Sequence, residues 1–351
     1  MAIHLKAQFE QLKLKPLAEQ VLVITGASSG IGLATALCAA RRGARVVLAS
    51  RNEQVLKKLV DQICTDGGLA THVVADVAIR DDLEKIARTA VERFGGLDTW
   101  INNAGVEVWG RIEDGSDAVH RRLFETNFWG VVYGSLTAVK YLRESGGALI
   151  NIGSIESDRA LPLQGIYSAS KHAVKGFTDS LRMELEKEGA PIAVTLIKPS
   201  SIATPLPQHA ENYMKKEIQL APPLYRPEDV AEAILHAAVH PVRDVVIGGG
   251  GRLMSTLGQV APRVMDRISE TLHFKAQMRD EPAHPHESNL YGPTTGGEVE
   301  GEHPGQWARH SLYTNARLHP MLVGGLISAA AGLAMISLLP HRRSGFGSFF
   351  R

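Results

Sequence analysis

Short apolar runs alternate with amphipathic stretches along most of this chain. The runs predict buried strands at residues 21–24, 46–48, 71–74, 100–101, 148–152, 192–197 and 244–247. The amphipathic stretches predict helices at residues 31–42, 53–65, 81–94, 167–188 and 228–239. Continuously apolar strands that alternate with helices are typical of a parallel sheet covered on both faces. We therefore expect an α/β fold with a doubly wound parallel sheet, formed as one domain by residues 20–250 after an N-terminal arm at 1–19.

The pattern changes after residue 250. Residues 251–279 predict an amphipathic helical extension with a kink at Pro262, because proline interrupts helical hydrogen bonding. Its apolar face has three interpretations: packing on the domain or a partner subunit, which we favour, contact with a membrane surface, or another partner interface. Residues 280–320 predict a flexible linker, since residues 280–302 hold six acidic side chains, no Lys or Arg, and several Gly and Pro.

A long uncharged segment follows the predicted linker. Residues 321–339 carry no charge over nineteen positions and precede a basic tail at 340–351. At about 1.5 Å per residue, a helix of this length would nearly span the ~30 Å core of a bilayer. The alternative is a buried helix of the domain, but no amphipathic face is visible. We therefore expect a transmembrane helix that anchors the chain to a membrane, with the domain at 20–250 in the cytoplasm.

Composition and charge narrow the function classes. The chain has 351 residues, 44% of them hydrophobic, and a net charge of +1, so nothing favours nucleic-acid binding. Its two cysteines, Cys38 and Cys64, are too far apart in sequence to suggest a disulfide framework, which suits a reducing compartment. His284 and His286 lack further ligands at metal-binding spacing, so we expect no metal site.

A glycine-rich turn, residues 25–32, lies between the first predicted strand and helix. Glycines let a phosphate approach the backbone, and the helix points its positive end at that phosphate. The alternative is a tight loop without a ligand. After the next strand the chain has Ser50, Arg51 and Asn52 where NAD-binding proteins place a carboxylate. Arg51 would attract a 2′-phosphate, so the pattern favours NADP(H) over NAD(H), unless Arg51 is an ordinary surface residue.

Tyr167 and Lys171 are the candidates for proton chemistry. Four residues apart on a helix, they share one face. A nearby ammonium lowers the pKa of a tyrosine, which could then exchange a proton with a carbonyl or alcohol oxygen. Ser154 ends a predicted strand, at the sheet edge where ligands bind in this type of fold. Each feature alone is common in structural roles.

Taken together, these motifs resemble the short-chain dehydrogenase/reductase family and its Rossmann-like fold. The turn at 25–32 matches TGxxxGxG, and residues 102–105 match NNAG. Asn127, Ser154, Tyr167 and Lys171 match the catalytic tetrad in order and approximate spacing. The resemblance covers residues 20–250, and the chain beyond lies outside the family pattern.

The resemblance implies roles for these residues. Tyr167 would be the general acid/base, Lys171 would lower its pKa and hold the nicotinamide ribose, Ser154 would orient the substrate oxygen, and Asn127 would hold a water. The implied cofactor contacts are Gly26, Ser28, Ser29, Gly30, Ile31, Gly32, Ser50, Arg51, Asn52, Asp76, Val77, Asn103, Ala104, Gly105, Tyr167, Lys171, Pro199, Ile202 and Thr204. Two features depart from the family pattern: Ser28 and Ser29 lack the basic residue of some NADP-preferring members, and Ser200 replaces a glycine.

We therefore expect an NADP(H)-dependent oxidoreductase that interconverts a carbonyl and an alcohol. Residues 205–225 would cover the substrate as a lid, and a membrane anchor would suit a lipophilic substrate. The family implies a homo-oligomer. The alternative is a non-catalytic cofactor-binding scaffold or assembly factor, which would have no need of both Tyr167 and Lys171.

Overall fold

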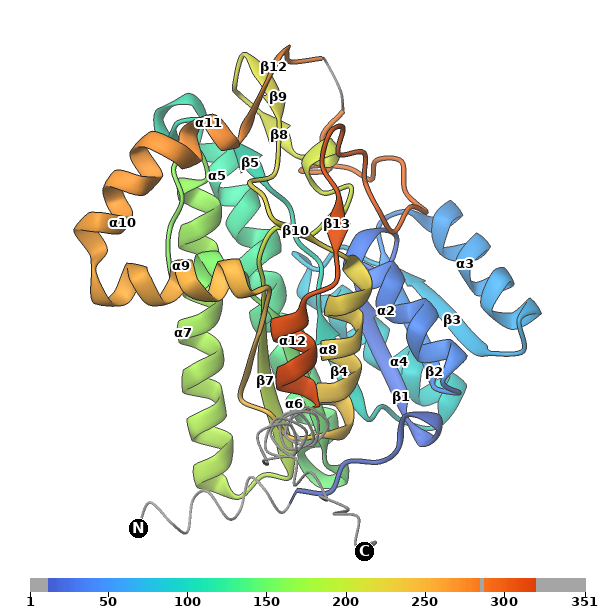
Figure 1. Ribbon diagram of the computed structural model, residues 1–351. Coiled ribbons are helices and arrows are strands. Elements are labelled where there is room, and N and C mark those ends of the chain that lie inside the picture. Colours follow the sequence, from blue (N-terminus) through green and yellow to red (C-terminus); the bar gives the residue numbers. More distant parts are fainter. Residues whose placement is uncertain (1–11, 285–286, 320–351) are drawn as a thin grey trace, which may run out of the picture. The chain divides into compact units, whose positions relative to one another are not determined.

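The computed structural model of the protein describes residues 12–284 and 287–319 and contains the expected doubly wound sheet (Figure 1). Seven strands lie in the order β11-β7-β6-β4-β1-β2-β3, and every neighbouring pair is parallel. They are β1 Val21–Thr25, β2 Arg45–Ser50, β3 Leu69–Val74, β4 Thr99–Asn102, β6 Gly147–Ile152, β7 Ile192–Pro199 and β11 Asp244–Ile247. The predicted fold class is confirmed.

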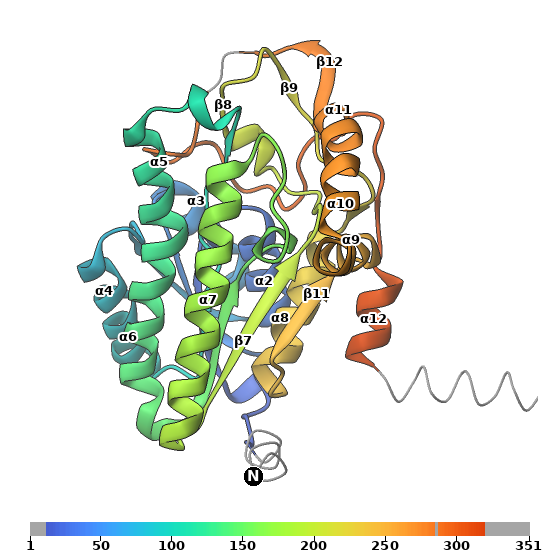
Figure 2. The same ribbon diagram turned by 90° about the vertical axis from the view of Figure 1, so that its left-hand side faces the viewer.

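Helices cover both faces of this sheet. On one face α2 (Gly30–Arg41) packs against α8 (Pro227–Val239), beside α3 (Glu53–Thr65). On the other face α4 (Arg80–Phe94) packs against α6 (Gly130–Ser145), and α7 (Gly165–Glu188) lies alongside (Figure 2). A buried apolar cluster, which includes Leu83, Ile86, Trp100, Leu142, Leu149 and Leu185, fills the space between this second layer and the sheet.

The connections at the carboxyl ends of the strands create a crevice. The chain leaves β1 toward β2 and β3, and then crosses to β4 and continues toward β6 in the opposite direction. The connections that follow β1 and β4 therefore run in opposite directions from neighbouring strand ends, and open sheets of this kind bind ligands at such a point. Smaller elements border this edge: β5 Val108–Trp109, α5 Asp117–Phe124, and three short helical turns, Glu125–Trp129, Ile155–Ser157 and Pro207–His209.

The amphipathic extension forms helices that break where proline predicts. One residue separates helix α9 (Gly249–Val260) from α10 (Pro262–Ile268). The chain then passes through the turn Ser269–His273 into α11 (Phe274–Ala276). Within the extension Ser255 and Met265 are buried, whereas Leu253, Val260, Val264 and Leu272 are exposed in this single chain. Packing on the domain therefore uses only part of the apolar face that the sequence indicated.

The segment after α11 folds back onto the domain instead of leaving it. Strand β12 (Met278–Pro282) pairs antiparallel with β9 (Lys216–Ile218), and β13 (Ala308–Arg309) pairs parallel with β10 (Leu224–Tyr225). Helix α12 (Leu312–Leu318) follows. This ordered path differs from the flexible linker that the composition predicts, because the domain supplies hydrogen-bond partners for a backbone that lacks an apolar pattern of its own.

Within the described part of the chain, no helix is long and apolar enough to cross a membrane. The segment at 321–339, which we predict to be a transmembrane helix, and the basic tail lie outside the described residues. Residues 12–284 and 287–319 contain no cluster of side chains that could hold a metal ion.

Candidate active site

The turn between β1 and α2 allows another backbone segment to approach closely. Gly26 has φ +66°, and a Cβ placed there would lie 2.7 Å from Cα of Ala104. A Cβ on Gly32 would lie 2.2 Å from the carbonyl oxygen of Gly26. Glycine alone fits both positions. Helix α2 begins at Gly30, so its electropositive end faces the crevice.

The segment after β4 is tied to this turn. Nδ2 of Asn103 donates hydrogen bonds to the carbonyl oxygens of Thr25 (3.0 Å) and Gly26 (3.1 Å). In return, Oγ1 of Thr25 accepts from the backbone N–H groups of Asn103 (3.0 Å) and Ala104 (3.1 Å). The carboxyl ends of β1 and β4 therefore form one rigid floor for the crevice.

The predicted site residues gather around a single pocket. All of them line it except Gly32 and Asn127. Gly32 packs beneath the glycine turn, and Asn127 lies behind Gly105, where its Oδ1 would be 3.5 Å from an added Cβ. Four residues that the motifs did not indicate, Asn289, Pro293, Thr294 and Thr295, line the same pocket from the C-terminal extension.

One end of the pocket carries Arg51 and Asp76, and Arg122 lies behind Asp76. Arg122 of α5 forms an ion pair of 2.5 Å with Asp76, which also accepts a 3.0 Å hydrogen bond from the N–H of Ala78. Burial opposes ionisation of Asp76, but these partners outweigh it and hold its pKa below the ordinary value. Arg51 is half-buried here, and both of its terminal nitrogens donate to backbone carbonyls of the extension. It is therefore not the solvated surface residue of the alternative interpretation.

The other end of the pocket carries the tyrosine, lysine and serine. Helix α7 places Tyr167 and Lys171 on one face, with Nζ of Lys171 5.5 Å from the centre of the Tyr167 ring. Nζ donates a 3.1 Å hydrogen bond to the carbonyl oxygen of Ile152, at the end of β6. Ser154 caps the next helical turn by accepting a 3.1 Å hydrogen bond from the N–H of Glu156.

Asn127 sits on a π-helical turn, Glu125–Trp129, between α5 and α6. Its Oδ1 accepts from the N–H of Val106 (2.8 Å), and its Nδ2 donates to the carbonyl of Val106 (2.9 Å) and to Oγ of Ser170 (3.3 Å). Single π turns inside helices recur at functional sites because they re-aim side chains. Here the turn locks a fully buried amide between the segment after β4 and α7.

The pKa of Tyr167 runs against the direction that the tyrosine–lysine pair alone indicates. Burial, together with the charges of Glu107 and Glu156, raises the pKa of Tyr167 well above its ordinary value. Burial also lowers the pKa of Lys171 to about 8, although the same two carboxylates oppose that shift. The pKa of Tyr167 is therefore raised, not lowered as the pairing with Lys171 predicts.

Glu107 and Glu156 are the functional candidates that the motifs missed. Both are buried in the pocket, where Glu107 accepts a 3.0 Å hydrogen bond from Nε1 of Trp109 and Glu156 accepts one from Oγ of Ser168. Burial raises their pKa values to about 7 and about 8. Each stands two residues after a recognised position, Gly105 or Ser154, and that placement at a strand's carboxyl end was the available signal.

The predicted lid, residues 205–225, borders the substrate end. Its strand β8 (Glu211–Asn212) pairs parallel with β5, which brings Pro207, His209 and Leu220 to the pocket. Trp109 both lines the pocket and packs, fully buried, against Ala210 of the lid. This end therefore combines apolar walls with the two carboxyl groups.

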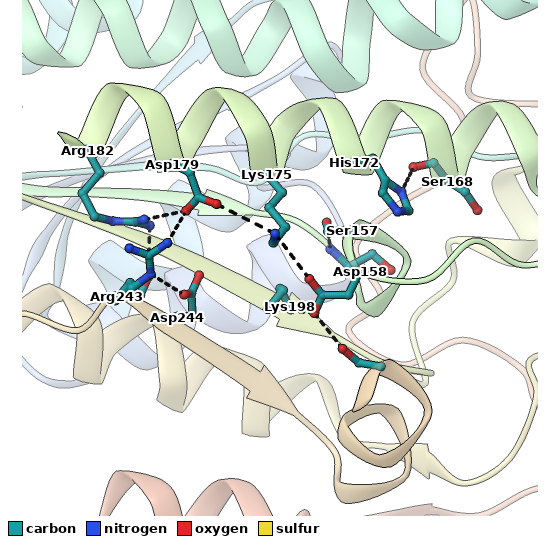
Figure 3. A network of polar contacts seen from close by, with 12 residues as sticks. Ser157, Asp158, Ser168, His172, Lys175, Asp179, Arg182, Lys198, Arg243 and Asp244 are labelled. Carbon is teal, nitrogen blue, oxygen red and sulfur yellow. Dashed lines mark hydrogen bonds and ion pairs between the residues drawn. The ribbon is translucent and has the colours of Figure 1, made fainter. Parts of the chain in front are cut away.

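A buried ion-pair network holds the turn after Ser154 (Figure 3). Asp158 lies between Lys198 of β7 (2.8 Å) and Lys175 of α7 (3.8 Å) and accepts a 2.9 Å hydrogen bond from Ser255 of α9. Burial disfavours the Asp158 carboxylate, but Lys198 outweighs it and the pKa lies below the ordinary value. The network thereby ties the turn after Ser154 to both the sheet and the extension.

Comparisons with known proteins agree with this geometry. The family model for short chain dehydrogenases matches residues 20–215. The uncharacterized oxidoreductase YxnA of Bacillus subtilis (strain 168) is 46% identical over 329 residues, 92% of either chain. The 11-beta-hydroxysteroid dehydrogenase A of Sesamum indicum is 33% identical over 268 residues, 73% of this chain and 76% of the relative. The Bacillus match is longer than the domain, so it continues into the extension.

A solved structure shows the same likeness. An alcohol dehydrogenase from the archaeon Thermococcus sibiricus, complexed with 5-hydroxy-NADP, has a TM-score of 0.58 and 25% identity to this chain. The match covers 65% of this chain and 95% of the archaeal one. The shared part is therefore comparable in extent to the sheet domain.

Proposed function

This chain belongs to the short-chain dehydrogenase/reductase family, and we propose that it uses NADP(H) with Tyr167 as the general acid/base. It is an oxidoreductase for CH–OH and C=O groups of a small molecule. The observation that carries the finer proposal is that Tyr167, Lys171 and Ser154 line the same pocket as the glycine turn and Arg51.

The pocket fits a dinucleotide cofactor by shape and charge. The glycine turn lines the pocket through Gly26 and Gly30 without side chains, and Arg51 and Lys171 supply cations at the two ends. When bound, the nicotinamide ring supplies or accepts the hydride. Arg51 would contact a 2′-phosphate, and Ser50 places no opposing carboxylate beside it.

The protein's own groups would handle the proton. The hydroxyl of Tyr167 donates a proton to the carbonyl oxygen during reduction and takes one from the alcohol during oxidation. Ser154 orients that oxygen, and the ammonium of Lys171, held by the carbonyl of Ile152, stabilises the phenolate as it forms. Asn127 would fix the segment after β4 against α7 through its hydrogen bonds to Val106 and Ser170, and it would also hold a water.

We propose a substrate with a largely apolar body. Leu161, Leu206, Leu220 and Trp109 form walls of the pocket, and one relative is named for a hydroxysteroid. Membrane anchoring through residues 321–339 and assembly into a homo-oligomer are separate proposals that rest on the sequence pattern and the family. Fractionation of the full chain tests the anchor: recovery in the soluble fraction without detergent contradicts it.

Replacement of Tyr167 tests the chemistry. Tyr167→Phe removes one hydroxyl and should lower NADPH-dependent reduction of a panel of apolar ketones by about 10²–10⁴-fold, with NADPH affinity retained. Tyr133→Phe is the matched control, since Tyr133 lies on α6 outside the pocket. Full activity of Tyr167→Phe refutes the proposed role. A wild-type chain that binds NADPH but reduces no ketone or aldehyde favours the scaffold alternative.

Cofactor preference has its own test. Arg51→Ala should weaken NADPH binding by roughly tenfold or more, since hydrogen bonds to charged groups contribute about 1.5–3 kcal/mol, and should leave NADH binding unchanged. Isothermal titration with both cofactors measures this. Tighter binding of NADH than of NADPH to the wild-type chain contradicts the proposed preference.

A further inference from the structure

Residues 287–303, which we call the C-terminal strap, lie across the mouth of the cofactor pocket. Figure 1 shows this orange-red segment passing above α2. The family match ends at residue 215, so the strap is outside the conserved dehydrogenase pattern. The strap nevertheless supplies Thr294 and Thr295 to the pocket wall.

At the adenosine end, the strap holds the basic residues. Nitrogen atoms of Arg51 donate to the carbonyls of Asn289 and Leu290, and Nε of Arg122 also donates to Leu290 at 3.0 Å. Nδ2 of Asn52 donates to the carbonyl of Thr294 at 2.9 Å. The side chains that would surround a 2′-phosphate are thus oriented by strap carbonyls.

Along the phosphate turn, the strap pairs with the backbone. The N–H of Gly297 donates to the carbonyl of Ser28, and the N–H of Gly30 donates to the carbonyl of Glu298, both at 2.9 Å. The donor on Gly30 belongs to the first turn of α2, whose N–H groups have no partner within the helix. The strap therefore lies directly over the segment that approaches the phosphates.

At the nicotinamide end, the strap contacts the lid. The N–H of Gly301 donates to the carbonyl of Ala203 at 3.1 Å, and Gln208 donates to the carbonyl of Glu302 at 2.6 Å. Leu290 anchors the strap from inside, fully buried in a cluster with Val106 and Tyr167. Contacts thus run along the whole length of the pocket.

We propose that the strap is part of the NADP(H) site, where it orients Arg51 and covers the bound dinucleotide so that release requires the strap to lift. This rests on the proposed cofactor function. The strap uses mostly its backbone atoms in these hydrogen bonds, and the partners lie in separate segments of the domain. The strap therefore detaches without unfolding the sheet. Cofactor release then proceeds at a rate set by strap opening.

Two glycines of the strap provide a matched test. A Cβ on Gly301 would lie 2.5 Å from the carbonyl oxygen of Thr204, so Gly301→Ala pushes the strap off the lid. A Cβ on Gly292 would meet nothing within 4 Å, so Gly292→Ala is the control. Neither residue lines the pocket. The measurement is stopped-flow release of NADPH from the full chain, followed by its fluorescence during a chase with excess NADP⁺.

Gly301→Ala should release NADPH about tenfold faster than wild type, while Gly292→Ala should match wild type. Hydrogen exchange of the wild-type strap gives an independent measurement, and NADPH should slow it. Equal release rates in all three chains, or strap exchange unaffected by NADPH, overturn the strap proposal. A wild-type chain that does not bind NADPH instead refutes the proposed function on which it rests.

Discussion

The sheet domain and the C-terminal extension are held in place by different means. In the domain, strands such as β1 and β6 are buried along nearly their whole length, and helices pack apolar faces onto them. In the strap, Leu290 is fully buried but the neighbouring Tyr291 is exposed, and most contacts are backbone hydrogen bonds to surrounding loops. The domain is stabilised by burial of its own apolar side chains, whereas the strap is ordered mainly by hydrogen bonds to the domain.

This difference indicates that the domain determines global stability and that the extension influences ligand exchange. Burial of apolar area is the dominant favourable contribution to folding, and it is concentrated in the domain. A net contribution of only about 0.5–1.5 kcal/mol per hydrogen bond makes the strap separable from that core. We therefore expect changes in the domain to affect global unfolding, and changes in the extension to affect ligand exchange.

One of the two largest effects should come from the network around Asp158, which joins the two regions. Asp158→Ala leaves Lys198 buried without its carboxylate, so we expect a loss of about 3 kcal/mol in the free energy of unfolding. Ser255→Ala removes only the link to α9 and should cost about 1 kcal/mol. Urea titration measures both. Equal losses would show that the extension is as essential to the fold as β7.

The Asp158 network also predicts a pH dependence. Because its folded pKa lies below the ordinary value, the stabilising contribution is complete above the unfolded pKa and is lost as pH falls through the folded one. Unfolding of wild type and Asp158→Ala should therefore converge in acid, which the same titrations at a series of pH values would detect.

Two buried leucines compare the regions directly. Leu48→Ala in β2 should lower the free energy of unfolding by about 3 kcal/mol, through lost burial and a cavity. Leu290→Ala removes an equally buried side chain, yet should lower it by less than about 1 kcal/mol because the strap detaches first. Its effect should appear in NADPH release instead. A global loss matching that of Leu48→Ala contradicts the separation of the two regions.

Glu107→Gln should change pH behaviour more than stability. The folded pKa of Glu107 is raised to about 7, so wild-type stability falls as pH rises from the ordinary value of 4.5 toward 7. Glutamine has no such penalty, and the stability difference in favour of the variant should grow across that window. Loss of the carboxylate also lowers the pKa of Tyr167, so the pH profile of alcohol oxidation should move to lower pH. An unchanged profile would place Glu107 outside the proton chemistry.

The smallest effect should come from the exposed ion pair between Lys216 and Asp280, 2.6 Å apart. Side-chain entropy and solvent screening offset the attraction in exposed pairs. Asp280→Asn should therefore leave the thermal midpoint unchanged within error. A clear decrease would mean that surface charge, rather than backbone pairing, holds β12 onto the lid.

The sequence predicted the parts of the molecule that carry a periodic pattern or a family motif. The strand at 244–247 and the helix at 53–65 match the structure residue for residue, because their apolar positions decide their burial. The glycine turn and the tetrad positions could be identified by spacing. Glu107 was missed, since its only signal is its place two residues after Gly105, and its raised pKa depends on burial in the folded chain. The strap was missed for a related reason: backbone carbonyls leave no signature in side-chain sequence.

The strap also has a thermodynamic consequence. It contacts the glycine turn through Ser28, the segment before the lid through Ala203 and the lid through Gln208, so a ligand bound at either end of the pocket would bias the same segment. Linkage then requires reciprocity: whatever factor bound cofactor adds to substrate affinity, bound substrate must add to cofactor affinity. A segment outside the family pattern would thus make the two ligands cooperative.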